Sequence, residues 1–329
     1  MGAQSTSNGL TLEGQKNGSN YKRQSSDTPG ANSKKRRRLV RGPWILPEDD
    51  ILRQSPSQKE SKITLAQELR LKESIHDFVV KLGLKLKVDA PTILATSVYL
   101  HRYYQTVQIT SSKYYVASAA LYISGKINDC VNSYDRISLY ACNLKNPQAA
   151  KCPAGRQPPP IDEQSEYYGR WKSQVTYREE MILHKLNFDL NFASPYLLQH
   201  KILNRIHSGM RSTFYEKRKD IMSRTIKLIE LLSSLPVILC YDMKVIFVVC
   251  FVITVLEGSN KFKDLTIPEN FTSISMEVPV AEAAKCFNLI KKLLEVAQSD
   301  TRCISNKAAA KRLLGISSEK FLEVAKGKP

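Results

Sequence analysis

The spacing of apolar and polar residues divides the chain into a long polar N-terminal segment and a succession of helix-length patterns. Within each pattern, apolar residues recur every three or four positions, which is typical of one face of an amphipathic helix. Helices are expected at about 64–82, 91–107, 112–127, 133–142 and 166–186. Further helices are expected at about 195–208, 214–233, 240–257 and 280–298, with a helix or helix pair at 306–326. The pattern predicts an all-α protein.

Several of these segments begin or end at residues that favour helix termini. Asp89 can cap a helix whose first turn contains Pro91, where the missing N–H of proline costs nothing. Ser194 followed by Pro195 repeats this arrangement. Gly83 is expected to end the first long helix. A short lead-in helix is expected after Trp44, ending by Ser55-Pro56-Ser57.

One apolar run conflicts with this helical pattern. Val245 to Leu256 is rich in Val, Ile and Phe, which favour strands by propensity. Its twelve residues are too few to span a bilayer, which takes about 20. The helical context therefore favours a buried central helix.

The stretch from Pro91 to Asp129 organises the rest of the chain. The centre of its second helix, residues 117–120, consists of small side chains that let neighbouring helices approach closely, so this helix is expected in the middle of a bundle. Lys126 follows directly, and a lysine half-buried by such a run needs a partner.

Two segments lack the helical pattern. Residues 1–43 contain almost no large apolar side chains and are expected to be disordered. Residues 143–165 are rich in Pro and form a predicted exposed insertion, tolerated or carrying a partner site. The predicted domains are a basic arm (1–43), two helical repeats (44–192 and 193–300) and a helical tail (301–329).

The chain is strongly basic, with a formal charge of +18 over 329 residues. Residues 1–43 hold nine Lys/Arg and two Asp/Glu, or +7, which leaves +11 for the remainder. A basic excess favours acidic partners or nucleic acid without naming one. The arm ends in a basic cluster that we interpret as a nuclear localisation signal; a nucleic-acid-binding arm and a merely solubilising charge run are the alternatives. The cluster consists of Lys34, Lys35, Arg36, Arg37 and Arg38.

The sequence gives no support to an enzyme. The seven cysteines include no CxxC pair, and metal-site spacing is absent, so we expect reduced intracellular thiols and no bound metal or cofactor. No GxGxxG, P-loop, HExxH or GxSxG motif occurs. His101 is expected to be a hydrogen-bonded structural histidine. Polar residues follow Met1, so we expect no signal peptide.

Three stretches resemble a known family. Val98–Tyr104 resembles the second helix of the cyclin box, and Ala119–Lys126 resembles its third helix, which ends in the kinase-binding lysine of the family. Glu179–Leu190 resembles the end of the box. The resemblance implies a tandem cyclin-box fold of two five-helix bundles. It is strongest to transcriptional cyclins of the T/K type, with the fungal Bur-kinase cyclin nearest among them.

The resemblance also implies a binding site for a kinase. Lys126 and Glu179 would be its two charges, brought together from two helices. Charge-assisted bonds would fix the register of a partner helix, and apolar neighbours would supply buried area. These neighbours are Ile123, Ile127, Leu183 and Phe188. The alternative is an ordinary surface ion pair, worth under ~1 kcal/mol.

Two departures from the family pattern matter. Cyclins usually carry two acids shortly after the lysine, whereas this chain has Asn128-Asp129. Leu71–Ile75 is a poor match to the substrate-docking motif of cell-cycle cyclins, because Glu73 and Ser74 replace small and apolar residues. The second departure argues for a transcriptional cyclin.

The implied function is a non-catalytic nuclear subunit that forms a heterodimer with a cyclin-dependent kinase and activates it. The RNA polymerase II C-terminal domain and elongation factors would be indirect partners, and neither a membrane nor direct nucleic-acid binding is expected. The alternative is a general transcription factor of the TFIIB type, which uses the same fold to bind DNA. Its zinc ribbon would need cysteines ahead of the core, yet the first is Cys130.

Overall fold

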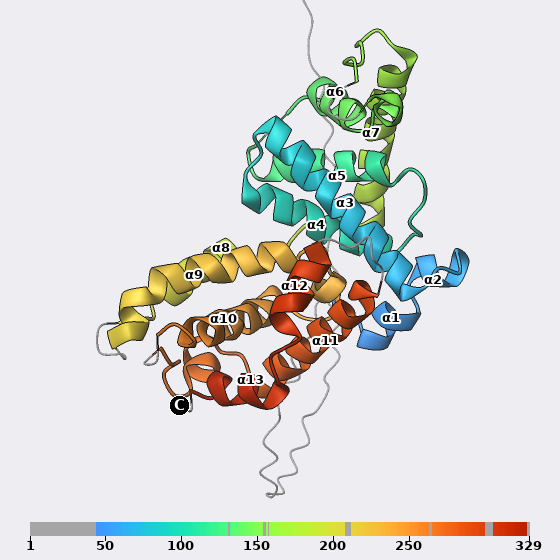
Figure 1. Cartoon of the computed structure of the whole chain (residues 1–329). Coiled ribbons are helices and arrows are strands. Elements are labelled where there is room, and N and C mark those ends of the chain that lie inside the picture. The colour runs from blue at the N-terminus through green and yellow to red at the C-terminus, as the bar shows by residue number, and fades with distance from the viewer. Residues whose placement is uncertain are drawn as a thin grey trace, which may run out of the picture. The chain divides into compact units, whose positions relative to one another are not determined.

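The computed structural model describes residues 44–130, 132–153, 156, 158–207, 212–262, 265–299 and 305–327. All regular elements of these ranges are helical, which confirms the predicted all-α class (Figure 1). The predicted disordered arm and its basic cluster, Lys34 to Arg38, lie outside the described residues.

The first helical group is built around one central helix. Helix α5 contacts all four of its long neighbours, and its small residues Ala117, Ala119 and Ala120 are fully buried, as the sequence predicts. Short helices α1 (Glu48–Arg53) and α2 (Pro56–Glu60) precede the group. Its five helices are α3 (Leu65–Leu86), α4 (Ala90–Tyr104), α5 (Lys113–Ile127), α6 (Tyr134–Leu144) and α7 (Glu166–Lys185).

The prediction that Gly83 ends the first long helix is wrong. Helix α3 continues to Leu86 and is closed by Lys87 in the left-handed conformation, with φ 59°. Gly83 serves helix packing instead, because a Cβ atom at this position would lie 2.9 Å from Ile93 Cδ1 of α4. Its missing side chain allows the two helices to approach closely.

Two predicted helix boundaries involve capping side chains. The Asp89 carboxylate accepts a hydrogen bond from the Thr92 N–H at 3.1 Å, which confirms the predicted cap of α4. Ser55-Pro56, expected to end the lead-in helix, also starts α2: Ser55 Oγ accepts a bond from the Gln58 N–H at 3.3 Å. Pro56 stands at the first position of that helix, where proline is favoured.

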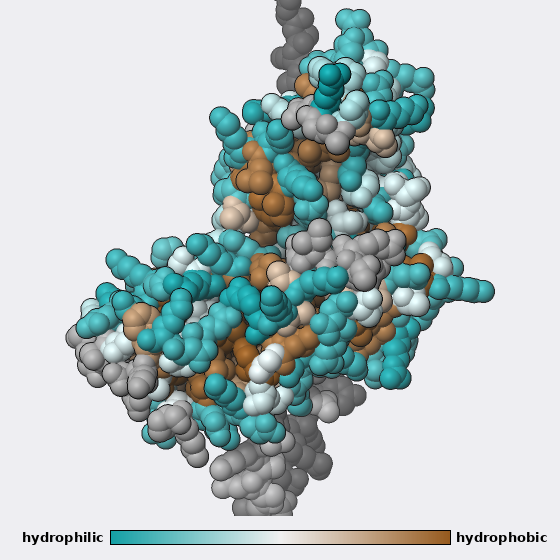
Figure 2. Space-filling model, viewed as in Figure 1, coloured by the Kyte–Doolittle hydropathy of each residue, from teal (hydrophilic) through white to brown (hydrophobic). Residues whose placement is uncertain are grey.

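The second helical group surrounds the apolar helix α10. Every residue of Val245–Leu256 is buried, so the predicted central helix is confirmed against the strand propensity of its residues. On the face shown in Figure 2, hydrophilic residues cover most of α9, which packs against α10. The group comprises α8 (Pro195–Leu203), α9 (Ser212–Leu232), α10 (Met243–Ser259) and α11 (Val280–Gln298), with short turns η2 (Pro236–Leu239) and η3 (Phe271–Ser275). Among the residues that the structure describes, no helix is both long enough and apolar enough to cross a membrane.

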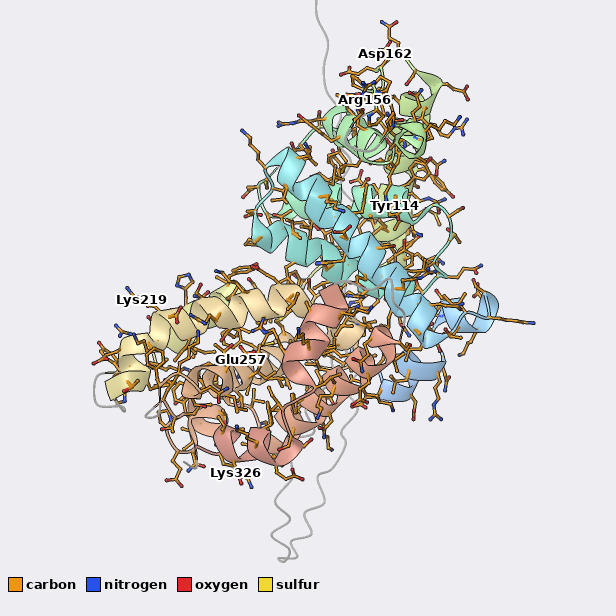
Figure 3. The ribbon with its side chains drawn as sticks, in the orientation of Figure 1. Tyr114, Arg156, Asp162, Lys219, Glu257 and Lys326 are labelled. Atoms are coloured by element: carbon orange, nitrogen blue, oxygen red, sulfur yellow. The ribbon has the colours of Figure 1, made fainter. Side chains whose placement is uncertain are left out.

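The tail forms a helix pair that covers the second group. Helices α12 (Ser305–Leu313) and α13 (Ser318–Ala325) both pack on α11. Phe321 of α13 stacks on Phe287 of α11 with ring centroids 4.4 Å apart. Arg312 of α12 forms an ion pair with Glu257 at 2.7 Å; Glu257 is labelled on α10 in Figure 3.

The two groups meet through a polar junction, which consists of Glu73, His101, Ser233, Ser234 and Asn306. His101 Nε2 lies 2.9 Å from the Ser233 carbonyl oxygen, and burial lowers the pKa of His101 to about 3, so the ring is neutral and structural, as predicted. The Glu73 carboxylate accepts hydrogen bonds from the backbone N–H and side-chain amide of Asn306, at 3.1 and 3.2 Å. These contacts tie the first group to the start of α12.

The predicted insertion after α6 has its two ends bonded to each other. The Asn146 side-chain amide donates to the Pro159 carbonyl oxygen at 2.9 Å, and the Ile161 N–H donates to Asn143 Oδ1 at 2.9 Å. The described part includes a short 3-10 turn, Pro147–Lys151. Arg156 and Asp162 lie at the end of the first group near α6 and α7 (Figure 3).

Candidate functional site

Lys126 and Glu179 meet across α5 and α7. Lys126 Nζ donates a hydrogen bond to Glu179 Oε1, between residues 53 positions apart in the sequence. The two partners differ in exposure, with 45% of the Lys126 side chain and 9% of the Glu179 side chain accessible. A buried carboxylate is costly unless it is paired, and Glu179 is paired here with a lysine whose side chain remains partly exposed.

The second oxygen of Glu179 is bound by a tyrosine. The Tyr134 hydroxyl donates to Glu179 Oε2 from the first turn of α6. That turn is fixed by Ser133, whose hydroxyl accepts the Arg136 N–H at 3.2 Å. Both carboxylate oxygens therefore have donors, and the buried acid is satisfied on each side.

A second tyrosine lies beside the lysine. Tyr122, one turn before Lys126 on α5, places its ring centroid 4.6 Å from the Lys126 ammonium, within the range of a cation–π interaction. Its ring also packs against that of Tyr134, with centroids 4.0 Å apart. We call Tyr122 and Tyr134 the tyrosine pair. It connects the two charges through a continuous set of contacts.

The turn between α5 and α6 brings Tyr134 to this position. The Cys130 N–H donates to the Gly125 carbonyl oxygen at 2.8 Å, which folds the chain back over the end of α5. A Cβ atom at position 125 would lie only 2.8 Å from the Cys130 carbonyl oxygen. Only glycine allows this close approach, so Gly125 shapes the path that leads to Tyr134.

The predicted apolar neighbours separate into exposed and buried residues. Ile127 is 48% and Phe188 63% exposed, and Leu183 is half-buried. Ile123 is only 2% exposed and belongs to the core, so its assignment as a surface contact is wrong. The reason is that α5 is the central helix, and its residues from Val116 to Gly125 are buried except for the partly exposed Tyr122.

Phe188 has an unusual backbone. Asn187 and Phe188 both adopt the left-handed conformation, with φ 49° and 57°. This region is uncommon for a bulky residue and costs free energy unless surrounding contacts maintain it. The Phe188 N–H donates to the Leu183 carbonyl oxygen at 2.9 Å, and the ring lies against His184 with centroids 5.6 Å apart. The result is an exposed aromatic ring presented at the end of α7.

The site contains charges and rings but no constellation of metal ligands. Throughout the ranges that the structure describes, no group of three or more His, Cys, Asp or Glu side chains is placed to hold a metal ion. The geometry instead suits contact with another protein, since Lys126 has spare hydrogen-bonding capacity and the ends of α5 and α7 carry the exposed side chains of Ile127 and Phe188.

Sequence reasoning found Lys126 and Glu179 but missed the tyrosine pair. The role of Tyr122 could have been predicted from the sequence. Residues four apart lie on the same face of a helix, so a tyrosine four positions before a lysine can form a cation–π contact with it. Tyr134 has no such signal, because its position depends on the turn at Gly125.

Comparison with known proteins identifies the first group. Residues 45–191 match the family model for the cyclin N-terminal domain. Cyclin pch1 of Schizosaccharomyces pombe is 28% identical over 154 residues, covering 46% of this chain and 42% of that protein. Cyclin-T1-2 of Arabidopsis thaliana is 29% identical over 163 residues, covering 47% and 32%. The chain thus spans less than half the length of these curated relatives.

A solved structure extends the likeness in fold to both groups. A chain in the crystal structure of the yeast RNA Pol II CTD kinase CTDK-1 complex matches with a TM-score of 0.57 and 16% identity, covering 87% of this chain and 84% of that chain. Residues 45–191 are therefore similar to cyclin N-terminal domains, and the chain as a whole has the cyclin fold. The resemblance to cyclins found in the sequence is confirmed.

Proposed function

We propose that the chain is a regulatory cyclin subunit that binds and activates a cyclin-dependent kinase acting in RNA polymerase II transcription. The observation that carries the proposal is the Lys126–Glu179 pair between α5 and α7, two helices whose ends carry the exposed side chains of Ile127 and Phe188. The names of the relatives, cyclins pch1 and T1, and the fold shared with a chain of a CTD kinase complex support it.

The geometry of Lys126 suits a partner that offers carbonyl oxygens. An ammonium has three N–H donors, of which one is bonded to Glu179, so the others are available to a partner backbone. A charge-assisted bond of this kind fixes register, while Ile127 and Phe188 supply apolar area to be buried. The arrangement can hold one helix of a kinase in a defined position.

Activation follows if the kinase helix is held in its active position. The chain would bind the active conformer more tightly than the inactive one and shift the population by that difference in affinity. The active position sets the kinase's own Lys–Glu ion pair and frees its activation loop. In this scheme the chain contributes no catalytic group, and the kinase performs phosphoryl transfer.

The proposed partner is a cyclin-dependent kinase in a heterodimer, located in the nucleus. The polymerase C-terminal domain and elongation factors would be reached through the kinase. The basic cluster from Lys34 to Arg38 is the proposed nuclear localisation signal.

The test is affinity purification from nuclear extract, scored for a co-purifying kinase and its activity. The test variant is Lys126→Ala/Glu179→Ala. The matched control is Glu166→Ala/Arg170→Ala, an exposed ion pair on the same helix α7 with a separation of 2.9 Å. Wild type and control should retain the kinase, and the test variant should lose it while its thermal melt shows that it is folded.

Two outcomes would reject the proposal. One is a test variant that retains the kinase as well as wild type does. The other is wild type that retains no kinase but binds DNA in a strongly salt-dependent way, which would favour the TFIIB-like alternative.

A further inference from the structure

We infer that the tyrosine pair consists of positioning residues for the kinase contact: Tyr134 holds Glu179, Tyr122 holds Lys126, and their packed rings join the two. The inference rests on the proposed function, because it concerns the same site. It adds a specific role for two side chains outside the predicted charge pair and its apolar neighbours.

Tyr134 keeps Glu179 in its buried position. The Glu179 side chain is 9% exposed, and its two oxygens are bound by Lys126 and Tyr134. Without the Tyr134 hydroxyl, one oxygen would be buried with no donor, which is unfavourable for a charged group. The carboxylate can relieve this by rotating toward solvent. Lys126 would then lose its fixed partner, and the ammonium would no longer be held at one point of the surface.

Tyr122 limits the motion of Lys126. Lysine has a long flexible side chain with large rotamer entropy, which is lost when the side chain is fixed on binding. The Tyr122 ring, 4.6 Å from the ammonium, already restricts the side chain in the free protein. A group ordered in advance loses less entropy on association, so this contact should increase affinity without touching the partner.

The packing of the two rings makes the arrangement a single unit. Tyr122 comes from α5, Tyr134 from α6 and Glu179 from α7, so three helices converge at Lys126. Loss of either tyrosine removes one contact to the charge pair and also removes the ring against which the other tyrosine packs. The effects of the two substitutions should therefore depend on Lys126 being present.

The experiment has one part that needs no kinase. In the free full-length chain, Lys126 is labelled with acetic anhydride and its modification rate is compared by mass spectrometry with that of Lys81, which is 60% exposed and paired with Asp77. Tyr134→Phe removes only the hydroxyl, and Tyr122→Leu removes the ring. Tyr140→Phe on α6 is the control, because that ring faces Arg136 instead. Labelling of Lys126 should rise about two- to five-fold in both test variants and stay unchanged in the control.

The second part measures the dissociation constant of the purified kinase complex. Each test variant should weaken binding roughly three- to thirty-fold. The same substitutions should have no further effect in a Lys126→Ala background, which a merely structural role would not predict.

The outcomes separate the inference from the proposed function. Unchanged Lys126 labelling, or equal losses of affinity with and without Lys126, would overturn the positioning role. If labelling changes as expected but wild type binds no kinase, the tyrosine pair orders Lys126 and the proposed function is wrong.

Discussion

The polar junction provides the most quantitative prediction, which concerns Asn306→Ala. Asn306 is 1% exposed and its amide donates to Glu73 at 3.2 Å, while its Oδ1 accepts the Ser234 hydroxyl at 3.1 Å. Losing a hydrogen bond to a carboxylate costs about 1.5–3 kcal/mol, and leaving a buried hydroxyl without its acceptor adds about 1 kcal/mol. The bond from the backbone N–H of residue 306 to Glu73 remains. We expect the free energy of unfolding to fall by about 2.5–4 kcal/mol.

The assay is equilibrium unfolding in urea, followed by tryptophan fluorescence and circular dichroism. A change of midpoint with an unchanged slope reports stability alone. The matched control is Asn288→Ala, because Asn288 accepts a hydroxyl bond from Ser318 at 2.8 Å but is exposed. That substitution should cost under about 0.5 kcal/mol.

A companion variant, Asn306→Asp, tests the electrostatic part of the reasoning. The introduced carboxyl would face the Glu73 carboxylate, and like charges at this distance repel. The pKa of the introduced carboxyl would be higher in the folded than in the unfolded protein. The variant is therefore most stable at low pH, where this carboxyl is protonated, and it loses stability as pH rises through the folded pKa. At pH 7 the Asp variant should be less stable than the Ala variant. The reasoning is refuted if Asn306→Ala unfolds within 0.5 kcal/mol (about the error of such measurements) of wild type, or if the two variants are equally stable at pH 7.

Three further predictions concern other parts of the first group. Gly125→Ala should displace the turn at Cys130, because the added methyl would lie 2.8 Å from its carbonyl oxygen, and should weaken kinase binding in a pull-down at least ten-fold; unaltered binding would contradict the role of the turn. Phe188→Gly should weaken kinase binding but raise the thermal midpoint or leave it unchanged. The lost ring is 63% exposed, and glycine adopts the left-handed backbone conformation of this position more readily than phenylalanine does. A lowered midpoint would show that the ring stabilises the fold. Burial would raise the pKa of Glu68, but Lys72 and the bonds from Ser55 and Gln58 outweigh it and hold the pKa below its usual range. The stability from Glu68 is therefore present above about pH 4.5 and lost as pH falls through the folded pKa, so Glu68→Gln should flatten the acid side of a melting-temperature profile between pH 3 and 7.

The sequence predicted elements whose cause is local and repeated. The apolar run of α10 was assigned correctly, because its all-helical context and its length of twelve residues favour a buried helix over a strand. Lys126 and Glu179 were found because their flanks carry a family pattern, and the match of residues 45–191 to the cyclin model confirms that pattern. Their role in binding a kinase stays a prediction.

The sequence could not predict features set by a distant neighbour. The sequence indicates a helix end at Gly83, but the glycine is required there because Ile93 of another helix packs against it. Ile123 reads as a surface residue near Lys126, but the depth of α5 in the bundle decides its exposure. Glu73 departs from the docking motif in the sequence, but Asn306, which binds its carboxylate, lies 233 positions away. No local sequence pattern predicts a contact between residues so far apart in the chain.

The same separation has a consequence during protein synthesis. A ribosome that adds ~5–20 residues per second needs roughly 10–50 s to pass from Glu73 to Asn306, and some seconds more for residue 306 to leave the exit tunnel. Throughout that interval the nascent first group lacks the two hydrogen bonds that Asn306 donates to the Glu73 carboxylate. These bonds form only after α12 has been synthesised, so a nascent polypeptide that stalls before α12 leaves the polar junction incomplete and is open to chaperones and proteases.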